Sequence, residues 1–169
     1  MRAFNRRKNR RRVTPTSDEK EEMKKPSPLT CFLLGIVLSV ALHCLLPLQR
    51  VIAFPWRLAG LVPLLAGIVL NLLADQALKQ HGTTVKPFEK SSAFVTDGVF
   101  RISRNPMYLG MTLVLLGIAL LLGSLTPLAV VILVPILFDR VFISPEEKML
   151  EQTFGDPFRE YRKRVRKWI

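Results

Sequence analysis

The stretch that decides the fold is PMYLGMTLVLLGIALLLGSLTPLAVVILVPILFDRVFI, residues 106–143. No charged residue interrupts it before Asp139. A helix of about 20 apolar residues crosses the hydrocarbon of a bilayer, so this run is too long for a single membrane helix. The Gly-Ser-Leu-Thr-Pro segment, residues 123–127, contains the residues that interrupt helices. The run therefore predicts a hairpin of two membrane helices of roughly 18 residues each.

Two more apolar segments precede this hairpin, at residues 29–48 and 58–78. The first contains no Lys, Arg, Asp or Glu and is long enough to span a bilayer. A signal peptide is the alternative for it, but the basic stretch before it is long and no small-residue cleavage site follows before Pro47. The sequence thus predicts an all-α fold: a polytopic membrane helix bundle with about four transmembrane helices and C-terminal cytoplasmic or interfacial helices.

The charges support a membrane protein. The chain has 169 residues and a net charge of +12, yet 49% of it is apolar, a combination that is unusual for a soluble domain. Of its 25 Lys and Arg residues, only Arg50 and Arg57 lie in the loop after the first span. Basic residues concentrate in cytoplasmic segments. Both termini and the loop 79–105 are therefore predicted to be cytoplasmic.

The basic N-terminal segment, residues 1–28, is predicted to be a disordered cytoplasmic tail. Its arginines, residues 6–12, are also compatible with a nucleic-acid arm. No aromatic residues interleave with them as stacking platforms. The lipid bilayer is therefore the expected partner, and no nucleic acid is expected. Cys31 and Cys44 lie inside a predicted span without metal-ligand spacing, so we predict no metal site.

The hairpin is entered through Arg104-Asn105-Pro106. Asn is a preferred N-cap residue, and Pro is favoured at the first position of a helix. A helix start of this kind presents free backbone N–H groups and the positive end of the helix dipole. With Arg101 and Arg104 beside it, the segment predicts a site for an anion at the cytoplasmic mouth of the bundle.

The second unusual stretch is SPEEKMLEQTFGDPFREYRKRVRKWI, residues 144–169. Ser144 is predicted to be an N-cap, with Glu147 as its partner in a capping box. This interpretation leaves Glu146 without a structural task. Asp139 and Arg140, just upstream, are interpreted as the cytoplasmic end of the fourth span.

Gly155 is predicted to end that helix, and Asp156-Pro157 to begin another. In the second helix the apolar residues recur at helical spacing among basic ones: Phe158, Tyr161, Val165 and Trp168. This pattern is typical of a basic amphipathic helix that lies on the membrane surface or covers the bundle mouth.

Other polar residues fall inside the spans. Asn71 and Asp75 share a helix face, which predicts either a polar cavity wall or simple solvation of Asp75 with Lys79 as its partner. His43 is expected to be hydrogen-bonded within the bundle. Together, an anion-favouring helix start and an acidic pair at one membrane face suit a ligand that carries both a carboxylate and an ammonium group.

These motifs, taken as a set, resemble the isoprenylcysteine carboxyl methyltransferase and phospholipid methyltransferase group of integral membrane enzymes. The likeness covers roughly residues 83–169, so residues 29–78 are expected to be two generic membrane helices and residues 79–169 the methyltransferase-like, cofactor-binding half. It implies S-adenosylmethionine as the methyl donor and a lipophilic or membrane-embedded acceptor, either an isoprenylcysteine carboxylate or a phospholipid amine.

The resemblance also implies site residues. The candidate catalytic residues are Arg104, Asn105 and Arg162. The candidate cofactor-binding residues are Asn105, Pro106, Tyr108, Glu146, Glu147 and Tyr161. Many carboxyl methyltransferases of the group have His at the position of Asn105, whereas phospholipid methyltransferases can have Asn, so the acceptor stays open.

Two other classes of function remain open at this point. A small multi-span transporter needs an ionisable residue deep in the membrane, and the first span offers only His43. A non-catalytic membrane adaptor would use the basic tails, but it leaves the spacing of the paired motifs unexplained.

Overall fold

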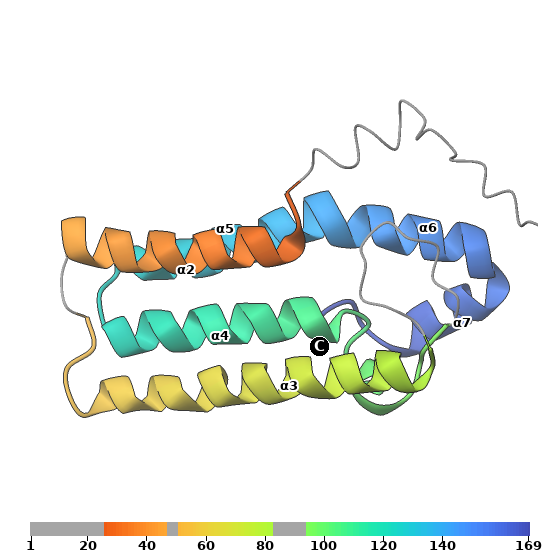
Figure 1. Cartoon of the computed structure of the whole chain (residues 1–169), viewed down its shortest axis with the longest axis horizontal. Helices are drawn as coiled ribbons and strands as arrows, with labels where there is room; N and C mark the ends of the chain where they lie inside the picture. Colours follow the sequence, from red (N-terminus) through yellow and green to blue (C-terminus); the bar gives the residue numbers. More distant parts are fainter. Residues whose placement is uncertain (1–25, 47–50, 83–93) are drawn as a thin grey trace, which may run out of the picture.

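The protein is described here from a computed structural model, which covers residues 26–46, 51–82 and 94–169. All regular elements in this part of the chain are helices. Four rods lie side by side in Figure 1: α2 (Pro28–Leu45), α3 (Leu61–Gln80), α4 (Pro106–Leu122) and α5 (Thr126–Phe138). The predicted all-α polytopic bundle is confirmed, and the break at residues 123–125 separates α4 from α5 as expected.

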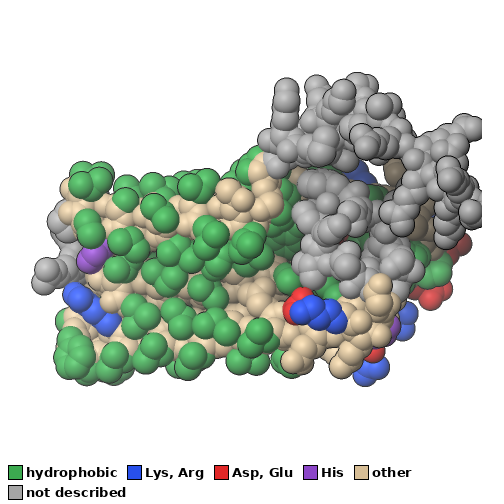
Figure 2. All heavy atoms as spheres, viewed as in Figure 1, with side chains coloured by type: hydrophobic (Ala, Val, Ile, Leu, Met, Phe, Trp, Pro, Cys, Tyr) green, Lys and Arg blue, Asp and Glu red, His purple; other side chains and the backbone are tan. Residues whose placement is uncertain are grey.

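The bundle has the dimensions and the surface of an integral membrane protein. Three helical segments are long and apolar enough to cross a membrane: Pro28–Leu45, Trp56–Gln80 and Thr126–Phe154. The fourth apolar helix, Pro106–Leu122, is shorter. Figure 2 shows hydrophobic side chains covering most of one face of α2, α3 and α4, with charged side chains gathered at its two ends. Lipid, rather than water, suits such a surface.

The rods alternate in direction. In Figure 1, α2 and α4 begin at one end of the bundle, and α3 and α5 begin at the other. We call the end where Pro28 and Pro106 begin their helices the proximal end. Because α2, α3, α4 and α5 alternate in direction, the start of α2 and the end of α5 lie at the same end of the bundle.

Helix α4 is the centre of the bundle. On one side it packs against α3 through glycines: a Cβ atom on Gly67 would lie 2.5 Å from the carbonyl oxygen of Gly110. On the other side it meets α2 and α5 around a core of larger side chains. That core is formed by Tyr108, Leu115, Val130, Val134, Phe138, Phe142 and Ile143.

The helix that contains α5 continues well past the position predicted for its end. A π-helical turn, η3 (Asp139–Ile143), joins α5 to α6 (Ser144–Phe154) without a break. The helix therefore does not end at Asp139 and Arg140. Their placement at the cytoplasmic end of the fourth span stays a prediction, because the length of a helix does not locate the edge of the bilayer. The N–H of Ser144 bonds to the carbonyl of Asp139, five residues back, and this wider turn accommodates Pro145, which has no N–H to donate.

For the same reason Ser144 is not an N-cap. Its backbone is helical (φ −65°, ψ −41°), and no side-chain capping bond precedes α6. The predicted capping box with Glu147 is absent from this helix. Glu147 is instead buried, with 8% of its surface exposed, and it points to partners elsewhere in the fold.

The next boundary was predicted correctly. Gly155, with φ +58°, ends α6, and α7 (Asp156–Arg164) begins directly after it. However, α7 ends at Arg164, because Val165 is extended (φ −118°, ψ 134°). Val165 and Trp168 therefore do not belong to this helix, contrary to the prediction. The last residues form an extended tail that folds back toward α4.

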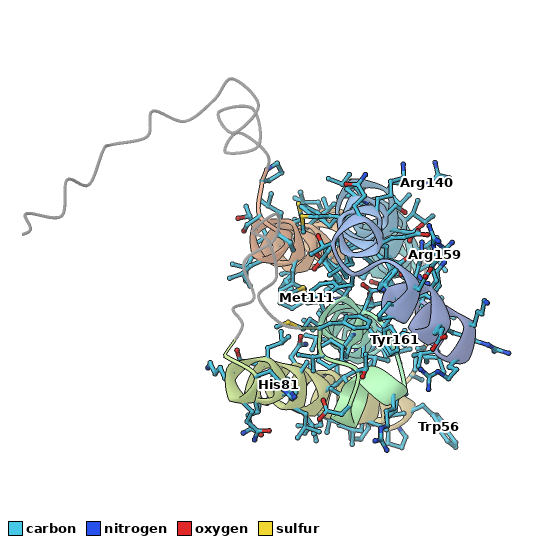
Figure 3. The ribbon with its side chains drawn as sticks, turned by 90° about the vertical axis from the view of Figure 1, so that its right-hand side faces the viewer. Trp56, His81, Met111, Arg140, Arg159 and Tyr161 are labelled. Atoms are coloured by element: carbon cyan, nitrogen blue, oxygen red, sulfur yellow. The ribbon has the colours of Figure 1, made fainter. Side chains whose placement is uncertain are left out.

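The apolar side of α7 is covered by the protein itself. Phe94 lies between α6 and α7, with ring centroids 5.1 Å from Phe154, 5.9 Å from Phe158 and 5.4 Å from Tyr161. Figure 3 looks along the bundle from the proximal end, with Tyr161 on the side of α7 nearer α4 and Arg159 toward the outer edge. Of the two predicted placements, the contacts favour the one in which α7 covers the bundle mouth.

Candidate functional site

The residues predicted to form the site come from three separate parts of the chain, and the third part is Tyr161 and Arg162 in α7. Arg104 and Asn105 precede α4, and Tyr108 lies in its first turn. Glu146 and Glu147 lie in the first turn of α6. The fold brings these groups within hydrogen-bond distance, although about 40 residues separate them in sequence.

Arg104 and Glu147 form a buried ion pair. The Nε and Nη2 atoms of Arg104 both lie 2.9 Å from Oε1 of Glu147. Only 8% of the Arg104 side chain and 10% of the Glu147 side chain are exposed. Two hydrogen bonds assisted by charge, shielded from water, make this a strong contact. The positive charge of Arg104 is thus already matched by a partner within the protein.

The remaining donors of Arg104 hold the C-terminal tail. Its Nη1 donates to the carbonyl oxygens of Arg162 (3.1 Å) and Val165 (2.8 Å). Its backbone N–H donates to the carbonyl of Arg166 at 3.0 Å. One arginine therefore ties the start of α4, the start of α6 and the tail into a single unit.

Asn105 occupies the N-cap position of α4, as predicted, but its side chain makes no capping bond. Its Nδ2 donates to the carbonyl of Lys167 at 3.2 Å and, at 3.5 Å, to Oε1 of Glu147. The prediction that the Asn105 side chain caps α4 is therefore wrong. The side chain instead uses its amide N–H groups as donors, to the carbonyl of the tail and to the carboxylate of Glu147.

Glu146 differs from Glu147 in its hydrogen-bond partner. Its carboxylate accepts a hydrogen bond from the hydroxyl of Tyr108 at 3.2 Å. No Lys, Arg or His of the described residues lies within ion-pair distance of it. Tyr108 is itself fixed by rings on α5 and η3, 5.3 Å from Phe138 and 6.4 Å from Phe142. A carboxylate in a rigid site without a cation is suited to bind an external cationic or hydroxyl group.

Pro106 is fully buried at the first position of α4, where it lacks an N–H and needs no acceptor. Tyr161 donates its hydroxyl to the carbonyl of Phe100 at 2.6 Å. Burial raises the pKa of the Tyr161 phenol to about 12, opposed by the positive charge of Arg104. The Arg162 side chain is 54% exposed and reaches Glu151 at 3.4 Å, so only its carbonyl joins the cluster.

Three polar residues of this cluster were not predicted. Ser103 is fully buried and donates from Oγ to the carbonyl of Lys167 at 3.2 Å. The Nζ of Lys167 lies 2.8 Å from Asp139 and 4.0 Å from Glu147. Nothing in the sequence links these positions, because the tail turns back only after α7 ends. The π-turn that carries Asp139 is of a kind often found at functional sites, but it is seen only in the structure and was not predicted from the sequence.

The other polar residues of the spans have structural roles. Asp75 pairs with Lys79 at 2.6 Å, which matches the simpler of the two interpretations. Asn71 donates to the carbonyl of Gly67 at 2.9 Å, within its own helix. His43 lies in the last turn of α2, hydrogen-bonded to Ser124 at 2.8 Å as expected within the bundle. His43 is thus at the distal end of a span and does not provide an ionisable group deep in the membrane.

Comparison with known proteins places these motifs in a wider group. A model of the phospholipid methyltransferase family matches residues 56–157. Over 76 residues, 45% of this chain, the sequence is 37% identical to the protein-S-isoprenylcysteine O-methyltransferase of Schizosaccharomyces pombe. An uncharacterized protein of Haemophilus influenzae is 42% identical over 64 residues, which are 37% of this chain and the whole of that protein.

A solved structure shares the fold. The eukaryotic intramembrane Ras methyltransferase, isoprenylcysteine carboxyl methyltransferase, aligns with 93% of this chain at a TM-score of 0.61 and 24% sequence identity. This chain covers 54% of that structure, and the matched segment covers 32% of the Schizosaccharomyces pombe protein. The arrangement of helices is therefore shared with an intramembrane methyltransferase over part of its length.

Proposed function

Because the chain belongs to the phospholipid methyltransferase family, we propose that it transfers a methyl group from S-adenosylmethionine to a lipophilic acceptor within the membrane. The observation that carries this proposal is the environment of Glu146. Its carboxylate is held by Tyr108 and lacks a cationic partner among the described residues. It therefore fits a donor that brings an ammonium group and ribose hydroxyls.

In the proposal, Glu146 and Tyr108 bind the donor, and Glu147 works through Arg104. The Arg104–Glu147 pair fixes the start of α6 against the start of α4 and so orients Glu146. The tail carbonyls that Arg104 and Asn105 hold complete the same unit. Arg104, Asn105 and Glu147 are positioning residues in this account, and so are Pro106, Tyr161 and the Arg162 carbonyl.

Methyl transfer of this kind requires that donor and acceptor be aligned, and it requires no reactive side chain of the enzyme. When bound, S-adenosylmethionine supplies an electrophilic methyl group on a sulfonium, and the acceptor supplies the lone pair. The enzyme's contribution is to place the two in line and to exclude water. The described fold offers a rigid aromatic wall, Tyr108 with Phe138 and Phe142, beside the carboxylate.

The acceptor is proposed to approach from the lipid. Tyr108 lies in the first turn of an apolar helix at the proximal end, where the headgroups of a bilayer would lie. The acceptor is proposed to be either a carboxylate of the isoprenylcysteine type or an amine of the phospholipid type. The distribution of basic residues supports the further proposal that the proximal end, with both termini, faces the cytoplasm.

The test uses the full chain in lipid nanodiscs. Calorimetry with S-adenosylmethionine should give saturable binding for which S-adenosylhomocysteine competes. Incubation with labelled donor and total membrane lipid should then label a lipid product, and its identity distinguishes a carboxyl from an amine acceptor. A well-folded protein that binds no donor under these conditions contradicts the proposal.

A further inference from the structure

Two segments about 60 residues apart in sequence form one surface at the proximal end. The backbone N–H of Arg104 bonds to the carbonyl of Arg166 at 3.0 Å, and the Ser103 hydroxyl bonds to the carbonyl of Lys167 at 3.2 Å. These bonds lay the extended tail beside the segment that leads into α4. The exposed side chains of the two segments form what we call the tail surface. It consists of Arg101, Ile102, Arg164, Arg166 and Ile169.

The positive charge of the tail surface is not compensated. In the described part of the chain, none of its three guanidinium groups forms an ion pair or a side-chain hydrogen bond. Three neighbouring cations differ, since Arg159 and Arg162 both pair with Glu151, and Lys167 pairs with Asp139. Lys163, next to Arg164, is exposed and forms no ion pair with a described residue. The tail and the loop beside it thus carry positive charge that no described carboxylate compensates.

The same surface carries exposed aliphatic side chains. Ile102 is 60% exposed and Ile169 is 70% exposed. A cationic side chain alone is most stable in water, and an aliphatic side chain alone is most stable in lipid. A surface that carries both is most stable at the boundary between the lipid headgroups and the acyl chains. There a basic side chain meets phosphate while an aliphatic one enters the hydrocarbon.

The position of the tail surface agrees with this boundary. Arg166 is bonded to the residue two places before Pro106, where α4 begins, and Figure 1 shows the C-terminus beside that helix start. Helices α2 and α4 both begin near this level. The apolar side chains of α7, Phe158 and Tyr161, are buried inside the protein and do not reach lipid. The tail and the loop beside it therefore provide the side chains that contact lipid at this level.

We propose that the tail surface binds anionic phospholipid headgroups of the leaflet at the proximal end. Its arginines would contact the phosphates, and Ile102 and Ile169 would enter the edge of the acyl region. This contact does not depend on methyl transfer. It would hold the tail, and with it the Arg104 unit, at the membrane surface.

The test compares two variants that each lose two positive charges. Arg164→Gln/Arg166→Gln removes charge from the tail surface. The control, Lys79→Gln/Lys148→Gln, removes it from exposed positions on α3 and α6. The full chain is reconstituted with phosphatidylcholine and a minor fraction of phosphatidylglycerol. Spin-labelled forms of both lipids then report the relative association constant of the protein for each. Circular dichroism and thermal melting establish that all proteins are folded.

The wild type and the control should prefer phosphatidylglycerol. In the tail variant this preference should fall by up to roughly fivefold for each arginine removed, and high salt should reduce the preference of the wild type in the same direction. Retention of the full preference by the tail variant overturns the proposal. An equal loss in the control also overturns it, because net charge alone would then explain the effect.

Discussion

Glu146 and Glu147 are neighbours in sequence but meet different partners in the fold. Glu147 is paired with Arg104 and buried, whereas Glu146 has only the neutral hydroxyl of Tyr108. The two residues lie about 100° apart around α6, so one points to the tail and the other to Tyr108. At the residue scale, this difference separates a carboxylate with a structural partner from the one that we propose binds the ligand.

Glu146→Gln should therefore lose affinity for the donor, whereas Glu147→Gln should lose stability. Hydrogen bonds to charged groups contribute about 1.5–3 kcal/mol, so Glu146→Gln should weaken donor binding roughly ten- to a hundredfold with little change in melting temperature. Glu147→Gln leaves Arg104 buried without a counter-charge and should lower the free energy of unfolding by on the order of 3 kcal/mol. Calorimetry and thermal melting measure the two effects.

The matched control is Glu151→Gln, because Glu151 pairs with Arg159 and Arg162 in solvent-exposed bridges and such bridges contribute little. The sequence alone suggested that Glu147→Gln would be nearly silent, since Gln can also close a capping box. The structure reverses that expectation because α6 has no capping box. Small and equal losses in both variants would remove the acidic pair from the proposed site.

Tyr161 gives the protein a sensitivity to alkaline pH. Its ordinary pKa of 10.0 is raised by burial to about 12 in the fold, so the folded state keeps the phenol proton longer than the unfolded state does. Its contribution to stability is complete below about pH 10 and is lost as pH rises toward 12. The melting temperature of the wild type should therefore fall across this window, and that of Tyr161→Phe should fall less steeply. Parallel pH profiles would contradict the assignment.

At the element scale, the contact between α3 and α4 depends on the absence of side chains. Gly67 and Gly110 let the two backbones meet, and Gly117 makes a second close approach with Leu64. The interface positions the start of α4, and with it the candidate site, against the second membrane helix. Leu65, on the same helix, is 57% exposed and faces outward.

Gly67→Ala should destabilise the bundle. Alanine favours a helix over glycine by about 1 kcal/mol, but its Cβ would lie 2.5 Å from a backbone oxygen that cannot move aside. Overpacking of this kind costs about 1–3 kcal/mol, so the net change should be a lower melting temperature in lipid. Ala66→Val, which enlarges an exposed neighbour, should leave it within a degree or two. A stabilised Gly67→Ala variant would mean that the helices are farther apart.

At the scale of the whole molecule, the four rods alternate and return the chain to the end from which it started. This agrees with the distribution of basic residues, which predicts both termini on the cytoplasmic side. Cysteines placed at Ser92, in the loop after α3, and at Ser124, in the break after α4, would test this topology by labelling. Ser92 lies outside the described residues. Ser124 is 2% exposed and bonded to His43, so it is a poor reporter of sidedness.

Leu125 and Gln152 are better reporters, because both are exposed and they lie at opposite ends of the molecule. In chains whose own cysteines are replaced by serine, Gln152→Cys should react with an impermeant reagent only from the cytoplasmic side. Leu125→Cys should react only from the other side. Labelling of both cysteines from one side would contradict the topology, and labelling with the sides exchanged would contradict the orientation.

The sequence by itself determined the fold class, the number of apolar rods and most helix boundaries. These features depend on local signals: runs of apolar residues, the helix break at residues 123–127, and the glycine before Asp156. Neighbouring residues in the sequence are sufficient to predict such features. It also singled out Arg104, Asn105 and the acidic pair, because these polar groups stand at the edges of apolar helices. Tyr108 was named only through the family resemblance.

Only the tertiary structure decided what those groups contact. The position of the tail, the Lys167–Asp139 pair and the Arg104–Glu147 pair depend on residues 28 to 64 positions apart. A sequence pattern shows which side chains share a face of one helix. It does not show which of two adjacent glutamates meets an arginine from another helix, because that choice depends on how the helices pack. The sequence had already left Glu146 without a structural task, but the partners of both residues, Arg104 for Glu147 and Tyr108 for Glu146, came from the packed structure. The binding of a ligand by Glu146 stays a proposal.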